Sequence, residues 1–109
     1  MQHQEYFKNL DLIERSWTKL KKNKFPQKDR DNFWRICMEG QDFFWHMRNS
    51  DIKNGFSLPK SVPSYERAIM LLENEEKYKQ AIFLCEQANK LGINTDWYTK
   101  RIEKLQKRI

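Results

Sequence analysis

Apolar residues recur every three or four positions through the first quarter of the chain, and no glycine or proline interrupts them. This spacing puts the apolar side chains on one stripe of a helix. The pattern predicts a helix over 2–24 that ends at Phe25-Pro26, because a residue before proline avoids the helical region. The stripe consists of Tyr6, Leu10, Ile13, Trp17 and Leu20.

A second apolar stripe, wider than the first, predicts another helix over 27–49. Only a short link at the proline separates the two helices, so we expect an antiparallel hairpin. In that hairpin Trp17 and Trp34 would lie at similar heights. Gly40 weakens the second helix by about 1 kcal/mol relative to alanine, which predicts a close approach of the neighbouring helix at this position.

The middle of the chain has the composition of a loop. An Asn-Gly pair and Pro59 interrupt the periodic pattern, and such residues mark turns. A connecting loop is therefore predicted over 51–62, with Phe56 and Leu58 packing onto the core.

Three shorter helices follow. Pro63 suits the first turn of a helix over 63–74. The next apolar stripe covers 75–91, and a glycine of the kind that commonly ends a helix follows it. Asn94 has a residue type preferred at a helix N-cap and precedes the last predicted helix, over 96–108.

Aromatic, large and small apolar residues follow one another in a fixed order between 62 and 95. They are Tyr65, Ala68, Leu72, Tyr78, Ala81, Cys85 and Ala88. The series resembles a single tetratricopeptide repeat (TPR), whose two antiparallel helices touch at such positions. Where that family favours glycine, this chain has Ile69 and Glu76.

The resemblance implies that the first helix of the pair binds a protein or peptide with its outward face. The corresponding positions are Glu66, Met70, Glu73 and Asn74. They lack the lysine and asparagine set with which the family holds the C-terminal carboxylate of a peptide.

The predicted fold is all-α, with about five helices in a single domain over 1–109. A long N-terminal helical hairpin (1–50) is expected to pack on the TPR-like hairpin, and a C-terminal capping helix completes the segment 63–109. A chain of 109 residues has room for one such domain.

The chain carries a net charge of +6, and the excess lies at its two ends. A basic surface attracts nucleic acid, acidic proteins or anionic membranes. Charge runs are more often solvated helix faces, and bases are favoured near helix C-termini, so both interpretations stay open. The basic residues considered are Arg15, Lys19, Lys21, Lys22 and Lys24, with Lys100, Arg101, Lys104 and Arg108.

The sequence lacks the residue patterns of catalytic and metal sites. Its two cysteines and two histidines include no Cys-x-x-Cys, His-Glu-x-x-His or similar ligand spacing. No metal, cofactor or catalytic residue is therefore predicted, and the protein is not expected to be an enzyme. Cys37 and Cys85 fall on apolar stripes and are predicted to be core residues, and His46 is predicted to be structural.

Two tryptophans lie off the main apolar stripes. Trp45 and Trp97 are therefore expected at the surface, where an aromatic side chain can anchor a partner. Trp97 stands four residues before Arg101, a spacing that predicts a cation–π pair within one helix.

These features favour a small non-enzymatic module that binds a protein partner, such as a regulator or inhibitor of that partner. The alternative is a nucleic-acid-binding protein that uses its basic N- and C-terminal helices. Self-association also stays open, because the stripe of the first helix has the spacing of a coiled-coil seam. No transmembrane run or signal-peptide pattern is present, so a cytoplasmic location without membrane contact is expected. The Lys-, Asn- and Ile-rich composition is typical of an A+T-rich genome, which favours a bacterial or phage source.

Overall fold

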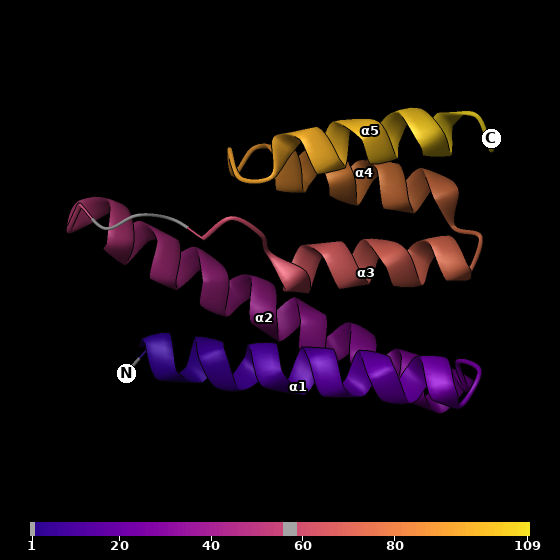
Figure 1. Cartoon of the computed structure of the whole chain (residues 1–109), viewed down its shortest axis with the longest axis horizontal. Helices are drawn as coiled ribbons and strands as arrows, with labels where there is room; N and C mark the ends of the chain where they lie inside the picture. The colour runs from indigo at the N-terminus through magenta and orange to yellow at the C-terminus, as the bar shows by residue number, and fades with distance from the viewer. Residues whose placement is uncertain (1, 56–58) are drawn as a thin grey trace. The chain divides into compact units, whose positions relative to one another are not determined.

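Helices make up all the regular structure in the residues that the computed structural model describes, 2–55 and 59–109 (Figure 1). The all-α prediction is confirmed. Within the described residues the five helices are α1 (Gln2–Lys22), α2 (Gln27–Lys53), α3 (Pro63–Asn74), α4 (Tyr78–Asn89) and α5 (Thr95–Gln106). Phe56 and Leu58, which were predicted to pack onto the core, lie outside the described residues.

The chain divides into two compact units, which we call the N-terminal unit (Met1–Leu58) and the C-terminal unit (Pro59–Ile109). The boundary falls within the segment 51–62 that was predicted to connect the helices. In the N-terminal unit α1 packs along α2, and in the C-terminal unit α4 packs along both α3 and α5.

The N-terminal unit is the predicted antiparallel hairpin (Figure 1). The ring of Tyr6 lies 6.0 Å from that of Phe44 near the open end, and the ring of Trp17 lies 5.6 Å from that of Phe33 near the link. These contacts confirm the predicted register to within one helical turn. Gly40 is buried on the same face of α2. The stripe of α1 thus packs within its own hairpin.

One member of the α1 stripe differs from the prediction. Asn9 is buried at the position expected for Leu10, which is only half-buried. The Nδ2 atom of Asn9 donates a hydrogen bond to the main-chain oxygen of Ile36, with 3.2 Å between the two atoms. Because a buried amide must find a partner, this contact lets a polar residue occupy a core position and helps to fix the register of the hairpin.

The chain reverses after α1 without a glycine. Lys24 and Phe25 both have positive φ, 60° and 56°, which is unusual for side chains with a Cβ. The N–H of Phe25 donates to the carbonyl of Leu20 over 2.9 Å, and the Phe25 ring lies 5.6 Å from the Trp17 ring. This hydrogen bond closes the last turn of α1, and the ring contact offsets part of the strain of the left-handed backbone.

The second helix continues four residues beyond its predicted end at 49. Nothing between Ser50 and Lys53 disfavours a helix, so α2 continues until Gly55 turns the backbone left-handed, with φ at 74°. The N–H of Gly55 donates to the carbonyl of Ile52 over 3.2 Å. The start of the predicted loop is therefore wrong by three residues, because it was placed before the Asn-Gly pair that ends the helix.

In the C-terminal unit α3 has the predicted bounds, and Pro63 occupies its first turn. Helix α4 begins three residues later than predicted, because Glu76 adopts a left-handed conformation with φ at 60°. The N–H of Lys77 then donates to the carbonyl of Leu72 over 2.9 Å, as in the turn that follows many helices. Glu76 is one of the two positions at which the TPR family favours glycine.

We expect the substitution Glu76→Gly to stabilise the C-terminal unit. A left-handed residue with a Cβ is strained by about 1–2 kcal/mol, and glycine removes that strain. The free energy of unfolding should therefore rise by about 1 kcal/mol, which raises the melting temperature by several degrees. Thermal and urea unfolding followed by circular dichroism would measure the change.

The matched control is Glu103→Gly, the same exchange at an exposed position inside α5. There it should lower stability by about 1 kcal/mol, because glycine is a poor helix former. Equal effects of the two substitutions would contradict the role assigned to Glu76.

Candidate interaction surfaces

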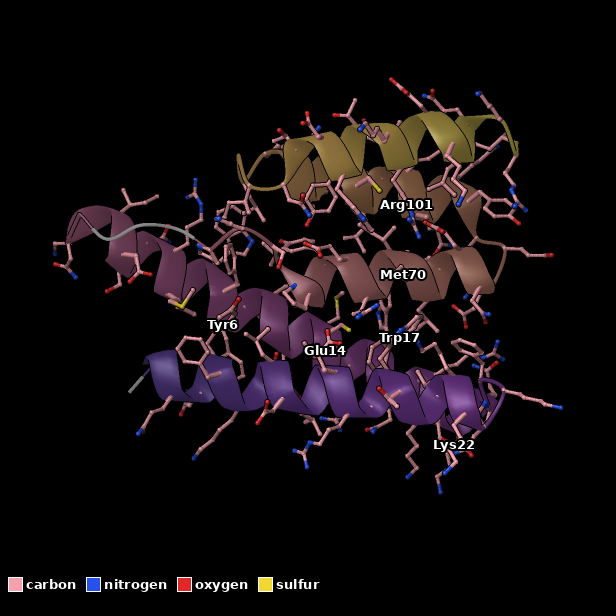
Figure 2. All side chains as sticks on the ribbon, viewed as in Figure 1. Tyr6, Glu14, Trp17, Lys22, Met70 and Arg101 are labelled. Atoms are coloured by element: carbon pink, nitrogen blue, oxygen red, sulfur yellow. The ribbon has the colours of Figure 1, made fainter. Side chains whose placement is uncertain are left out.

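Long polar side chains join α3 to α5. The guanidinium of Arg101 reaches both carboxylate oxygens of Glu73, with Nε 2.5 Å from Oε2 and Nη2 3.0 Å from Oε1. The two side chains are only 21% and 16% exposed, so water screens this ion pair less than a surface pair. Figure 2 shows Arg101 between α5 and α3. The paired contacts match the planar fork of arginine to the carboxylate.

A second carboxylate makes a similar connection two turns earlier. The Oε2 atom of Glu66 accepts hydrogen bonds from the Val62 N–H at 2.6 Å, from Asn94 Nδ2 at 3.3 Å and from Tyr98 Oη at 3.4 Å. Asn94 is the N-cap residue of α5, as predicted, but its side chain makes no capping bond and points to Glu66 instead.

We call the group Glu66, Glu73, Asn94, Tyr98 and Arg101 the α3–α5 clasp. The pairs Glu66–Asn94 and Glu73–Arg101 are each 28 residues apart in the chain, which means that α3 and α5 run parallel. The clasp therefore holds the two outer helices of the C-terminal unit against α4 in a defined register.

The four predicted peptide-binding positions on α3 have different surroundings. Glu66 and Glu73 belong to the clasp. Met70, half-buried between them on α3, accepts a contact from Arg67 Nη1 at 3.5 Å from its sulfur. Asn74 is exposed at the end of α3. Two of the four positions are thus engaged in the clasp, and Asn74 alone of the four is fully exposed.

The two tryptophans that were expected at the surface are both half-buried. The guanidinium of Arg101 lies 4.7 Å from the Trp97 ring centre, which confirms the predicted cation–π pair. Trp45 has a similar neighbour, because the guanidinium carbon of Arg48 lies 5.2 Å from its ring centre. An arginine on the same helix thus covers part of each ring.

The titratable groups of the core are suited to structure rather than catalysis. Cys37 and Cys85 are both buried, and neither forms a disulfide. Burial raises the pKa of the Cys85 thiol from 9.0 to about 12, and the charge of Glu73 adds to the rise. Burial and the Glu66 carboxylate raise the pKa of Tyr98 above its usual 10.0. Both groups therefore stay protonated near neutral pH, where a thiol is a poor nucleophile.

The described residues contain no group of three His, Cys, Asp or Glu side chains close enough to hold a metal ion. A hollow of about 340 Å³ lies at the start of α4, but no histidine or cysteine lines it. None of the helices within the described ranges has both the length and the apolar character needed to span a membrane.

The structure separates the basic residues into different surroundings. Arg101 is in the clasp, and the guanidinium of Arg108 lies 5.7 Å from the Tyr78 ring centre. The others are exposed, and Lys100 and Lys104 share one face of α5. Exposed bases on α1 and on the turn after it are Arg15, Lys19, Lys21, Lys22 and Lys24.

One row of bases on α1 is free of carboxylate partners. Arg15, Lys19 and Lys22 follow one another at intervals of four and three residues, which places them on one face. Lys8, which sequence analysis missed, lies seven residues before Arg15 on that face. In Figure 2, Lys22 lies near the C-terminal end of α1. Among the described residues none of these four bases has a carboxylate within ion-pair distance.

Large apolar side chains are exposed on three of the described helices. On α1, Phe7 is 59% and Leu12 is 39% exposed, on α2 Ile52 is 52% exposed, and on α4 Phe83 is 62% exposed. These residues were not predicted to be exposed, although each lies off the buried stripe of its helix. A position off the stripe indicates exposure, but exposure was predicted on this ground only for the two tryptophans.

Comparison with protein-family models, with curated proteins and with solved structures finds no match for this chain. The TPR resemblance of 62–95 therefore stays a prediction.

We expect the Glu73–Arg101 pair to contribute more to stability than an ordinary surface pair. A double-mutant cycle with Glu73→Gln and Arg101→Gln should give a coupling energy of about 1–2 kcal/mol, because charged hydrogen bonds shielded from water are the strong ones. Urea unfolding of the two single variants, the double variant and the parent would measure it.

The matched control is the Arg35–Glu39 pair of α2, whose side chains are 63% and 49% exposed. Its coupling energy should stay below about 0.5 kcal/mol. If both cycles gave the same value, the clasp would be no more than a surface contact.

We also expect the protein to lose stability in alkaline solution. The folded state keeps the protons of Cys85 and Tyr98 at pH values where the unfolded chain releases them, because both pKa values are raised by folding. Stability should therefore be constant below about pH 8 and should fall as pH rises above about 9. Urea midpoints between these conditions and about pH 11 would show it. The variant Tyr98→Phe should have a shallower decline above about pH 10, and an unchanged slope would contradict the assignment.

Proposed function

We propose that this chain is a small non-enzymatic module that binds a protein partner through the outward face of α1. The α1 face consists of Phe7, Lys8, Leu12, Arg15, Lys19 and Lys22. The observation that carries the proposal is the exposure of Phe7 and Leu12 beside bases that have no ion-pair partner. Phe7 and Leu12 are five residues apart, so they lie at the two edges of this face with the bases between them. A mixture of exposed apolar and charged side chains is a common composition of a protein-binding surface.

The charges of this face favour an acidic partner. Leu12 is surrounded by Lys8, Arg15 and Lys19, which lie four residues before it and three and seven after it. Like charges spaced three or four residues apart on a helix repel one another by about 0.2–0.5 kcal/mol per pair. The helix dipole explains bases in the last turn of α1 but not Lys8 or Arg15. A carboxylate-rich partner would relieve this repulsion and speed association.

The C-terminal unit supports a module of this kind without supplying its contact surface. Its hairpin α3–α4 resembles a repeat unit that binds proteins, and the left-handed Glu76 occupies the position of a family glycine. Its two clasp carboxylates, however, are already paired within the unit. We also propose a cytoplasmic location, which two buried cysteines that form no disulfide support.

Nucleic acid is the second candidate for the same face. The row formed by Arg15, Lys19 and Lys22 spans about 10 Å along α1 and is free to contact phosphates. Contacts of this type depend on charge and not on Phe7 or Leu12. A protein partner would therefore need both the apolar residues and the bases of α1, whereas nucleic acid would need only the bases.

The test compares two sets of substitutions. Phe7→Ser with Leu12→Ser removes the exposed apolar side chains, and Arg15→Gln with Lys19→Gln and Lys22→Gln removes the charges. The control is Lys100→Gln with Lys104→Gln and Lys107→Gln, which removes three exposed bases from the C-terminal end of the chain. Proteins captured from a cell lysate by each variant would be compared by quantitative mass spectrometry, and the partner found would be purified for direct titration.

We expect a partner that binds the parent and the C-terminal control but is lost from both α1 variants. Binding of duplex DNA and RNA, measured by fluorescence anisotropy at several salt concentrations, tests the second candidate. Three phosphate contacts to DNA would give a slope of about −2.7 in log K against log salt, which the charge variant abolishes and the apolar variant leaves intact. That result would replace the protein partner with nucleic acid.

A further inference from the structure

The outward face of α4 has an unusual composition. Its opposite face is buried and formed by Ala81, Cys85 and Ala88, against which α3 and α5 pack. Phe83 occupies the centre of the outward face and is 62% exposed. Leaving a phenylalanine in water forgoes the free energy of burying it, and a lone aromatic at the centre of a helix face can serve as an interface anchor.

Charged and amide side chains surround Phe83 in a regular order. Lys79 lies four residues before it and Glu86 three residues after it, on one flank. Gln80 and Gln87 occupy the equivalent positions on the other flank. We call the set Lys79, Gln80, Phe83, Glu86, Gln87 and Lys90 the α4 face.

The two opposite charges on one flank do not neutralise each other within the helix. Lys79 and Glu86 are seven residues apart, which separates them by about 10 Å along the axis. Neither residue forms an ion pair with any other side chain in the described parts of the chain. Each is therefore available to a partner that carries the opposite charge at the corresponding height.

A second copy of the same helix carries those charges when it runs antiparallel. A two-fold axis beside Phe83 and perpendicular to the helices brings the two Phe83 rings together. The flank with Lys79 and Glu86 then faces the same flank of the second copy. Lys79 then lies opposite Glu86 of the second copy, and this pair occurs twice. On the other flank Gln80 lies opposite Gln87 of the second copy, and amide side chains can donate to and accept from each other.

The ends of α4 also bring opposite charges near each other in the antiparallel pair. Lys90, seven residues after Phe83, comes near the turn before α4 of the second copy, which carries the exposed Glu76. Lys79 and Glu86 are thus matched directly in an antiparallel pair. In a parallel pair every charge would lie opposite itself, which is unfavourable.

We propose that this chain associates with a second copy of itself, antiparallel and two-fold symmetric, through the α4 face with Phe83 against Phe83. The inference goes beyond the proposed function and concerns a different helix, so either can fail without the other. A face that complements itself is the requirement for an isologous dimer. One 12-residue helix, about 18 Å long, offers less area than a stable interface needs, so the dimer is weak and concentration-dependent.

Sedimentation equilibrium tests the association directly. The apparent mass should rise from 13.4 kDa toward twice that value between about 10 µM and about 1 mM, the range in which a small interface becomes populated. Phe83→Ser should raise the dissociation constant about tenfold or more. Phe7→Ser is the matched control, because it removes an equally exposed phenylalanine from α1 and should leave the constant unchanged.

Exchange of charges tests the pairing. Glu86→Lys should weaken the dimer, because it places a second ammonium group against Lys79 of the other copy. Combining it with Lys79→Glu restores opposite charges at both places and should recover the parent constant. A protein that stays monomeric throughout, a dimer sensitive to Phe7→Ser instead of Phe83→Ser, or a double variant no better than Glu86→Lys would overturn the proposal.

Cross-linking tests the orientation. When chains with Gln80→Cys are mixed with chains with Gln87→Cys and oxidised, disulfides between the two kinds of chain should form fastest. A parallel pair would favour disulfides between two copies of the Gln80→Cys chain and would overturn the two-fold arrangement. The native thiols do not interfere, because Cys37 and Cys85 are both buried.

Discussion

The arrangement of the C-terminal unit depends on the ion pair between Glu73 and Arg101. Helices of 12 residues are marginal on their own, and α3 and α5 each pack along α4 rather than along each other. The long Arg101 side chain bridges α3 and α5, and Glu66 makes a second bridge two turns away. The polar side chains with the most specific geometry in this unit are thereby used for folding. The outward surfaces of the helices remain for recognition, and there the spacing of charged and apolar side chains determines what can bind.

The sequence was sufficient for the features that depend on one element at a time. The apolar stripes, Pro63 at the start of α3 and the pairing of Trp97 with Arg101 all follow from spacing along a single helix, and each is found in the structure. The features that were missed depend on residues far apart in the chain. Asn9 can be buried because the carbonyl of Ile36 accepts its amide hydrogen, and Glu66 is a structural residue because Asn94 and Tyr98 reach it. These hydrogen-bond partners lie on other helices or loops, so the apolar periodicity of a single helix does not reveal them. The start of α4 was missed for a different reason, since a left-handed residue other than glycine, such as Glu76, leaves no compositional signal.

The same distinction explains why the candidate surface residues changed. Tryptophans off the buried stripe were expected to be exposed, but arginines three and four residues further along their helices cover Trp45 and Trp97 in part. Phenylalanines off the stripe have no such neighbour, and Phe7 and Phe83 remain more than half exposed. An exposed aromatic can therefore be predicted only when the side chains one turn away are considered together with it.

The charge around each phenylalanine determines what can bind there. The bases of the α1 face outnumber the neighbouring acids Glu5 and Asp11, so two copies of this face repel each other and an acidic surface relieves the repulsion. On α4, the two bases Lys79 and Lys90 are balanced by the two acids Glu76 and Glu86. Each base on one side of Phe83 has an acid at a similar distance on the other side, so a second copy of this face in antiparallel orientation presents opposite charges to it. A basic polymer or an acidic one would each meet two like charges there. Because each surface rejects the partner of the other, the chain would pair with itself through one unit while the second unit stays open to a different molecule.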